Sequence, residues 1–126
     1  MRVFIDTHVL VWWWGAVTEL SRTALATLND PRNEILVSAA AAYEIELKRA
    51  FDPLLQQLPY DLAAAAALDG FVFQPVTAEI ATVAGRLPKI HRDPWDRILA
   101  AHAMVAGVPV ISVDRKLIQF GVSLIW

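Results

Sequence analysis

Short runs of β-branched and other apolar residues recur along the chain, and most of them lead into a longer segment with helical spacing. The runs predict buried strands over residues 2–5, 34–37, 71–73, 108–113 and 122–126. The longer segments predict helices over residues 9–14, 21–28, 38–50, 60–68, 77–87, 93–106 and 114–120, with a short helix between Pro53 and Pro59. Strands that alternate with helices indicate an α/β fold.

This alternation predicts one domain over residues 1–126, in which a twisted parallel sheet of about five strands carries helices on both faces. Hydrophobic residues make up 56% of the chain and charged residues only 19%. Such a composition is expected for a sheet that is buried on both faces, or for a surface that a partner covers.

The sequence contains no cysteine, which excludes disulfides, zinc–thiolate sites and thiol nucleophiles. A cytoplasmic location is our expectation, because this composition is compatible with a reducing compartment. The first apolar run is too short for a signal peptide, and charges or prolines interrupt every run that could span a membrane. With a net charge of −2, binding of nucleic acid would need a local basic patch together with cations.

Four acidic residues stand near the ends of predicted strands or the starts of predicted helices: Asp6, Glu44, Asp96 and Asp114. Asp6 and Asp114 each follow a strand, and the carboxyl ends of parallel strands share one edge of the sheet. Asp96 projects from the start of a helix toward the same edge. Clustered carboxylates stay ionised only beside cations, so we expect these four acids to bind Mg²⁺ or Mn²⁺.

Each acid taken alone also fits a structural role. Asp6 and Asp114 could cap the helices that follow them, and Glu44 could form an ion pair with Lys48, four residues further on. The case for a metal site therefore depends on the four acids together, in a chain that has few charges.

Two neighbouring residues are expected to support such a site. Asp93 precedes Pro94 and has the pattern of a helix N-cap, and Ser112 could orient a carboxylate or a metal-bound water. A pair of cations about 4 Å apart can activate water for attack on phosphorus and stabilise the leaving oxygen. No protein general base is then required, and no Ser-His-Asp arrangement competes.

Four stretches, in this order, resemble the PIN domain, and more closely the VapC-type toxins of bacterial toxin–antitoxin pairs: FIDTHVLVWW, SAAAAYEIELK, HRDPWDRILAAHA and VISVDRKLIQFGVSLIW. The resemblance extends over nearly the whole chain. It implies an endoribonuclease that depends on Mg²⁺ or Mn²⁺, a cognate antitoxin protein and a homodimer. By motif position it implies Asp6, Glu44, Asp96 and Asp114 as metal ligands, supported by Asp93, Ser112 and Thr7.

Two residues depart from the family pattern. Tyr43 replaces the more usual tryptophan before the glutamate, and Ala41 stands where a serine is common. Neither change removes a metal ligand, so the departures leave substrate preference more open than activity.

Basic and aromatic residues near the acids are candidates for RNA contacts. The basic candidates are Lys89, Arg92, Arg97 and Arg115, although an ordinary solvated loop explains them equally well. Trp95 is the nearest aromatic residue for base stacking, but core packing is the favoured interpretation.

Trp12, Trp13 and Trp14 cannot all face the core, because adjacent helical positions point in different directions. We expect at least one of them at an interface, either with an antitoxin peptide or with a second copy of the chain. His8 and His102 are expected to be packed polar residues, since a site for hard cations takes oxygen ligands.

Other classes of α/β protein fit less well. A receiver domain needs an acidic pair after the first strand, but Thr7 follows Asp6. A haloacid-dehalogenase-like phosphatase needs Asp-x-Asp, and His8 occupies the second acidic position. The alternative that stays open is a PIN-like module that binds RNA or a protein without cleaving it.

Overall fold

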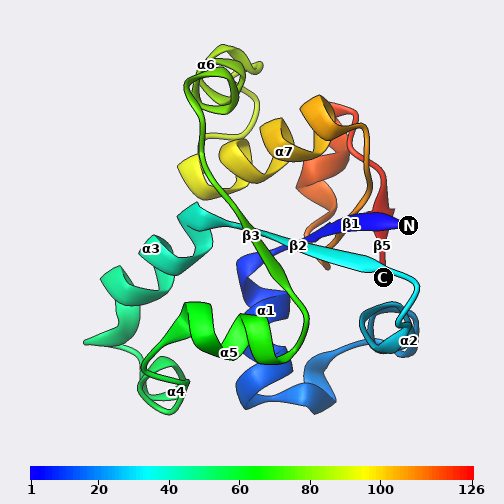
Figure 1. Cartoon of the computed structure of the whole chain (residues 1–126). Helices are drawn as coiled ribbons and strands as arrows, with labels where there is room; N and C mark the ends of the chain where they lie inside the picture. The colour runs from blue at the N-terminus through cyan, green and yellow to red at the C-terminus, as the bar shows by residue number, and fades with distance from the viewer.

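A five-stranded parallel sheet forms the centre of the computed structural model, which describes residues 1–126 (Figure 1). The strands are β1 (Arg2–Ile5), β2 (Glu34–Ser38), β3 (Val72–Gln74), β4 (Val110–Ile111) and β5 (Leu124–Ile125). Their order is β3-β2-β1-β4-β5, and every neighbouring pair is parallel. The winding direction reverses between β1 and β4, which is where α/β sheets bind ligands, beyond the carboxyl ends of the strands.

Seven α-helices and two 3₁₀ helices connect the strands. They are α1 (Thr7–Gly15), η1 (Val17–Glu19), α2 (Arg22–Asn29), α3 (Ala39–Arg49), α4 (Pro53–Gln56), α5 (Leu62–Leu68), α6 (Ala78–Arg86), α7 (Pro94–Ala106) and η2 (Arg115–Phe120). The side chains of Asp6, Asp93 and Asp114 cap α1, α7 and η2 by accepting backbone N–H groups. The predicted capping roles are thus confirmed for all three residues.

Alternate residues of the strands enter two hydrophobic cores, one on each face of the sheet. Val3 and Ile5 of β1 belong to the same cluster as Leu10 of α1, whereas Phe4 belongs to the cluster that contains Leu99 of α7. Successive side chains of a strand point to opposite faces, which explains this division. Helices cover both faces, as predicted: α1, α4 and α5 lie below the sheet in Figure 1, and α6 and α7 lie above it.

The last two strands are shorter than the sequence predicts. Strands are expected over 108–113 and 122–126, but β4 and β5 have two residues each. Pro109 has no N–H to donate, and the chain leaves the sheet at Ser112, whose hydroxyl oxygen accepts the N–H of Asp114 at 3.0 Å. The helix predicted at 114–120 is a 3₁₀ helix, and it ends at Gly121, which has a φ of +82°. None of the helices is both long and apolar enough to cross a lipid bilayer.

Candidate functional site

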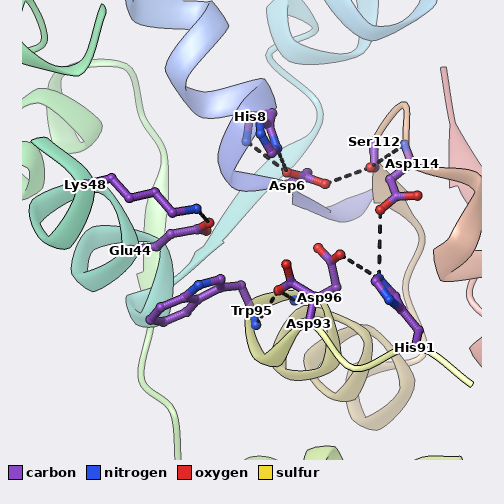
Figure 2. Close-up of polar contacts among 10 residues, drawn as sticks. All are labelled: Asp6, His8, Glu44, Lys48, His91, Asp93, Trp95, Asp96, Ser112 and Asp114. Atoms are coloured by element: carbon purple, nitrogen blue, oxygen red, sulfur yellow. Dashed lines mark hydrogen bonds and ion pairs between the residues drawn. The ribbon is translucent and has the colours of Figure 1, made fainter. Parts of the chain in front are cut away.

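Carboxylates from four separate elements gather at the carboxyl edge of the sheet, and together they form the carboxylate ring of Asp6, Glu44, Asp96 and Asp114 (Figure 2). Asp6 joins β1 to α1, Glu44 lies on α3, Asp96 is in the first turn of α7, and Asp114 precedes η2. Asp6, Glu44 and Asp96 line one small hollow, together with Thr7. The fold therefore brings together the acids that the sequence pattern singles out.

Asp6 is buried, yet it stays ionised because hydrogen bonds surround it. Its Oδ1 accepts the backbone N–H of His8 at 2.8 Å, and its Oδ2 accepts the hydroxyl of Ser112 at 2.8 Å. Burial raises the pKa of Asp6, but the hydrogen bonds from His8 and Ser112 outweigh burial and hold the pKa below its ordinary value. One carboxylate thus serves as a helix cap and as a negatively charged group of the ring.

Glu44 faces inward from α3 and is buried. Lys48 Nζ donates to Glu44 Oε2 at 2.5 Å, while the Lys48 side chain is 52% exposed. The expected pair at positions i and i+4 is therefore present. The carboxylate itself is in the protein interior beside Asp6 and Asp96, and not in solvent.

The ionised form of Asp96 is destabilised by its surroundings. Asp93 caps the same turn of α7 by accepting two backbone N–H groups on its Oδ1, at 2.9 and 3.2 Å. Burial raises the pKa of Asp96 to about 6; a hydrogen bond from His91 acts against this rise, and the charges of Asp93, Asp6 and Asp114 add to it. The neighbouring acids therefore concentrate negative charge around Asp96.

The donor set of the ring fits a divalent cation. Carboxylate oxygens are the ligands that Mg²⁺ and Mn²⁺ prefer in proteins. Burial raises the pKa of Asp96, and repulsion from Asp93, Asp6 and Asp114 adds to this rise; a bound cation would relieve the repulsion. Asp6, Glu44, Asp96 and Asp114 are the residues that would hold such an ion.

Comparison with known proteins identifies the family. The family model described as the PIN domain matches residues 3–122, which is almost the whole chain. The chain belongs to the PIN-domain family. A comparison with curated proteins finds none that matches.

Several solved structures share this fold at low sequence identity. VapBC2 from Rickettsia felis, bound to a DNA fragment from its promoter, has a TM-score of 0.68 at 15% identity, over 98% of this chain and 97% of that one. FitAcB from Neisseria gonorrhoeae has a TM-score of 0.67 at 16% identity, over 97% and 95%. VapC20 from Mycobacterium tuberculosis, a toxin that cleaves the sarcin–ricin loop, has a TM-score of 0.66 at 20% identity, over 95% of each chain. At such identities the likeness establishes the fold.

One predicted RNA contact in this PIN domain requires a correction. All five N–H groups of the Arg97 guanidinium donate to backbone carbonyls, which belong to Ala84, Gly85, Leu87, Pro88 and His91, at 2.6–3.3 Å. A guanidinium has five N–H donors, so none is left for a phosphate. Arg97 instead fastens the end of α6 and the following loop to α7.

The other predicted basic contacts have free, exposed side chains. Lys89 and Arg92 are exposed and border an open hollow of about 400 Å³ beside the Arg97 anchor. Arg115 is exposed next to Asp114. These three residues therefore stay candidates for RNA contacts.

Of the two histidines that were expected to be packed, only His102 is. His102 is a packed polar residue as expected: its Nε2 lies 2.9 Å from Ser38 Oγ, and burial lowers its pKa. His8 is not packed, because its side chain is 69% exposed and its Nδ1 lies 3.2 Å from Asp6 Oδ1; this hydrogen bond raises the pKa of His8. His91 reaches the ring itself, which its place in a basic loop did not indicate.

The tryptophans of α1 and α7 are only half-buried. Trp95 is half-buried, lines the hollow and packs against Tyr43 at 5.5 Å between ring centroids, and Tyr43 is 62% exposed. Trp12, Trp13 and Trp14 are all half-buried, and all three pack against the cluster that contains Leu10. The assignment of one of them to an interface stays a prediction.

Ser112→Ala is expected to weaken metal binding about 10- to 100-fold, because the hydroxyl orients Asp6 and receives the N–H of Asp114. We also expect a loss of about 1–2 kcal/mol in the free energy of unfolding. Ser112→Thr keeps the hydroxyl and is expected to bind metal almost as the wild type does. Titration calorimetry with Mn²⁺ measures the effect, and equal affinities for the alanine variant and the wild type would contradict it.

Proposed function

We propose that this PIN-domain protein is a metal-dependent endoribonuclease and the toxin of a toxin–antitoxin pair. The observation that supports the nuclease is the carboxylate ring, in which the pKa of the half-buried Asp96 is raised to about 6 by burial and like charges. A protein gains little stability from such an arrangement, and pKa values perturbed in this way gather at functional sites. The toxin assignment is supported by the fold shared with toxins and toxin–antitoxin complexes.

The reaction proposed is hydrolysis of an RNA phosphodiester, in which water adds to phosphorus and the bond to one ester oxygen breaks. Divalent cations, when bound, would activate water and stabilise negative charge on the phosphoryl oxygens. Asp6, Glu44, Asp96 and Asp114 would hold the cations. Ser112 fixes the rotamer of Asp6 through its 2.8 Å hydrogen bond, and Asp93 fixes the start of α7.

The RNA backbone would approach across the exposed basic side chains. Lys89 and Arg92 lie on the loop that precedes α7, and Arg115 lies just after Asp114. All three are therefore close in the sequence to an acid of the ring. Phosphate contacts of this kind position a strand without reading its bases. Tyr43 and Trp95 offer aromatic surfaces for an unpaired base at the other side of the hollow.

An antitoxin segment is the partner that we propose for a groove of about 250 Å³ between α1, α3 and α4. Its walls include the apolar side chains of Val11, Trp12 and Leu54, and it reaches Glu44. Such a groove suits a peptide with apolar side chains and a basic residue that extends to the carboxylates. A cytoplasmic location and a homodimer complete the proposal, and the mass of the purified protein in solution tests the dimer.

Incubation with total RNA tests the nuclease. Purified protein, freed of any bound partner, is expected to cleave RNA with Mg²⁺ or Mn²⁺, and to lose this activity in EDTA and in the Asp6→Asn variant. Cleavage that survives both controls would point to a contaminating enzyme. Metal binding by the folded protein without cleavage would point to a very narrow RNA substrate. A protein that neither cleaves RNA nor binds metal would favour the alternative, a PIN-domain module that binds without cutting.

A further inference from the structure

One side chain inside the carboxylate ring is not an acid. His91 is 12% exposed, and its Nε2 lies 2.7 Å from Asp96 Oδ2 and 4.0 Å from Asp114 Oδ2. Figure 2 shows the imidazole between these two carboxylates, on the side of the ring away from Glu44. A nitrogen donor therefore enters a site whose other donors are oxygens.

The fold holds this imidazole in place from two directions. The ring of His91 stacks on Phe120 of η2, with an interplanar angle of 17° and 6.0 Å between centroids. Its backbone carbonyl accepts a hydrogen bond from Arg97 Nη1 at 3.0 Å. These contacts come from η2 and α7, the elements that also present Asp114 and Asp96, so the same two elements position all three donors.

The distances between the three donor atoms suit a single cation. His91 Nε2, an oxygen of Asp96 and an oxygen of Asp114 all lie within 4.8 Å of one another. An octahedral ion with bonds of about 2.1 Å has adjacent ligands about 3 Å apart and opposite ligands about 4.2 Å apart. The separations of 2.7 and 4.0 Å from Nε2 are close to these two values.

We propose that His91 is a nitrogen ligand of the cation held by Asp96 and Asp114, and that it makes this position favour Mn²⁺ over Mg²⁺. Mg²⁺ is a hard ion that prefers oxygen ligands, whereas first-row transition ions accept imidazole nitrogen readily. The inference rests on the metal centre of the proposed function but not on RNA cleavage. The competing role for His91 is a hydrogen bond that orients Asp96 while oxygens alone bind the ion.

Electron spin echo spectroscopy of the Mn²⁺-loaded protein separates the two roles. A coordinated imidazole is expected to give a ¹⁴N modulation in the wild type, to lose it in His91→Gln and to keep it in His8→Gln. His8 is the matched control because its imidazole also contacts a ring carboxylate, at 3.2 Å from Asp6. Glutamine can still donate a hydrogen bond to Asp96, so the variant keeps the orienting contact.

Each outcome has a defined meaning. Bound Mn²⁺ without ¹⁴N modulation, or modulation that persists in His91→Gln, overturns the role of His91 and leaves the metal centre intact. Modulation that disappears in His8→Gln alone assigns the nitrogen to His8 and also overturns it. A protein that binds no Mn²⁺ contradicts the proposed metal centre itself, which is a separate failure.

Calorimetric titration measures the selectivity directly. His91→Gln is expected to lower the affinity for Mn²⁺ about tenfold or more and to change the affinity for Mg²⁺ much less. Equal losses for the two ions would contradict the selectivity, because a residue that merely orients Asp96 would affect both. Circular dichroism and a melting curve of the metal-free variant establish that it is folded.

Discussion

Asp96→Asn is expected to stabilise the metal-free protein at pH 8 by about 1–3 kcal/mol and to lower the rate of the proposed RNA cleavage about 10²- to 10³-fold. Both effects have one cause. Burial and neighbouring acids raise the pKa of Asp96 to about 6, so the folded protein holds an ionised group in an unfavourable place. Asparagine has nearly the same shape but no charge, and it removes a ligand that a cation needs.

The stability effect has a defined dependence on pH. The pKa of Asp96 is raised from 3.8 to about 6 on folding. Below about pH 4 the group is largely protonated in both states and has little effect on stability. Between about pH 4 and pH 6 the folded protein keeps a proton that the unfolded chain has released, so stability falls as the pH rises. The advantage of Asp96→Asn should therefore be small at pH 4 and reach its full size above pH 6.

Urea unfolding in EDTA at several pH values measures this difference. Glu19→Gln removes an exposed carboxylate from η1 and is the matched control, for which we expect little change at any pH. Saturating Mn²⁺ is expected to stabilise the wild type more than Asp96→Asn, because the ion binds the folded ring. If the gain in the free energy of unfolding for Asp96→Asn does not vary with pH, the destabilisation does not come from the ionised Asp96 carboxylate.

Arg97→Lys is expected to lower the free energy of unfolding by about 2–4 kcal/mol, although the charge is unchanged. The arginine donates to five backbone carbonyls of the segment from Ala84 to His91. Lysine has a single ammonium nitrogen at the end of a flexible side chain. It cannot reach all five carbonyls, which lie around the planar guanidinium group of arginine. The loop that carries His91 would then be fastened to α7 less firmly.

Chemical denaturation measures the loss, and hydrogen exchange at residues 85–92 is expected to become faster in the variant. Arg92→Lys is the control, since Arg92 lies on the same loop with an exposed side chain. Similar unfolding midpoints for the two variants would show that the carbonyl contacts of Arg97 add little to stability.

Much of the fold could be predicted because its determinants are local. The apolar runs around Val3 and Leu36 and the caps at Asp6 and Asp93 depend on neighbours in the sequence, and the structure has the corresponding strands and helices. The short length of β4 was less predictable. The chain leaves the sheet at Ser112, whose hydroxyl accepts the N–H of Asp114 and donates to Asp6, 106 residues away in the sequence.

Topology brings the strand ends before Asp6 and Asp114 to one edge, whereas Glu44 lies within a helix and was singled out by the family pattern. The roles of Arg97 and His91 needed coordinates. A basic residue near acids suggests a phosphate contact, and nothing in the sequence reveals that backbone carbonyls already use all the donors of Arg97. His91 lies in an irregular loop, which has no periodicity from which its direction could be read. Its contact with Asp96 is fixed by stacking on Phe120, which lies 29 positions further along the chain.

The span of the carboxylate ring along the chain has a consequence for synthesis on the ribosome. Asp6 is made 108 residues before Asp114, and the ring closes only after β4 has inserted beside β1. A nascent chain whose Asp114 is still inside the exit tunnel therefore lacks a complete site, as does any fragment cut short before Asp114. Whatever activity the ring has is withheld until the segment that contains β4 and Asp114 has left the ribosome.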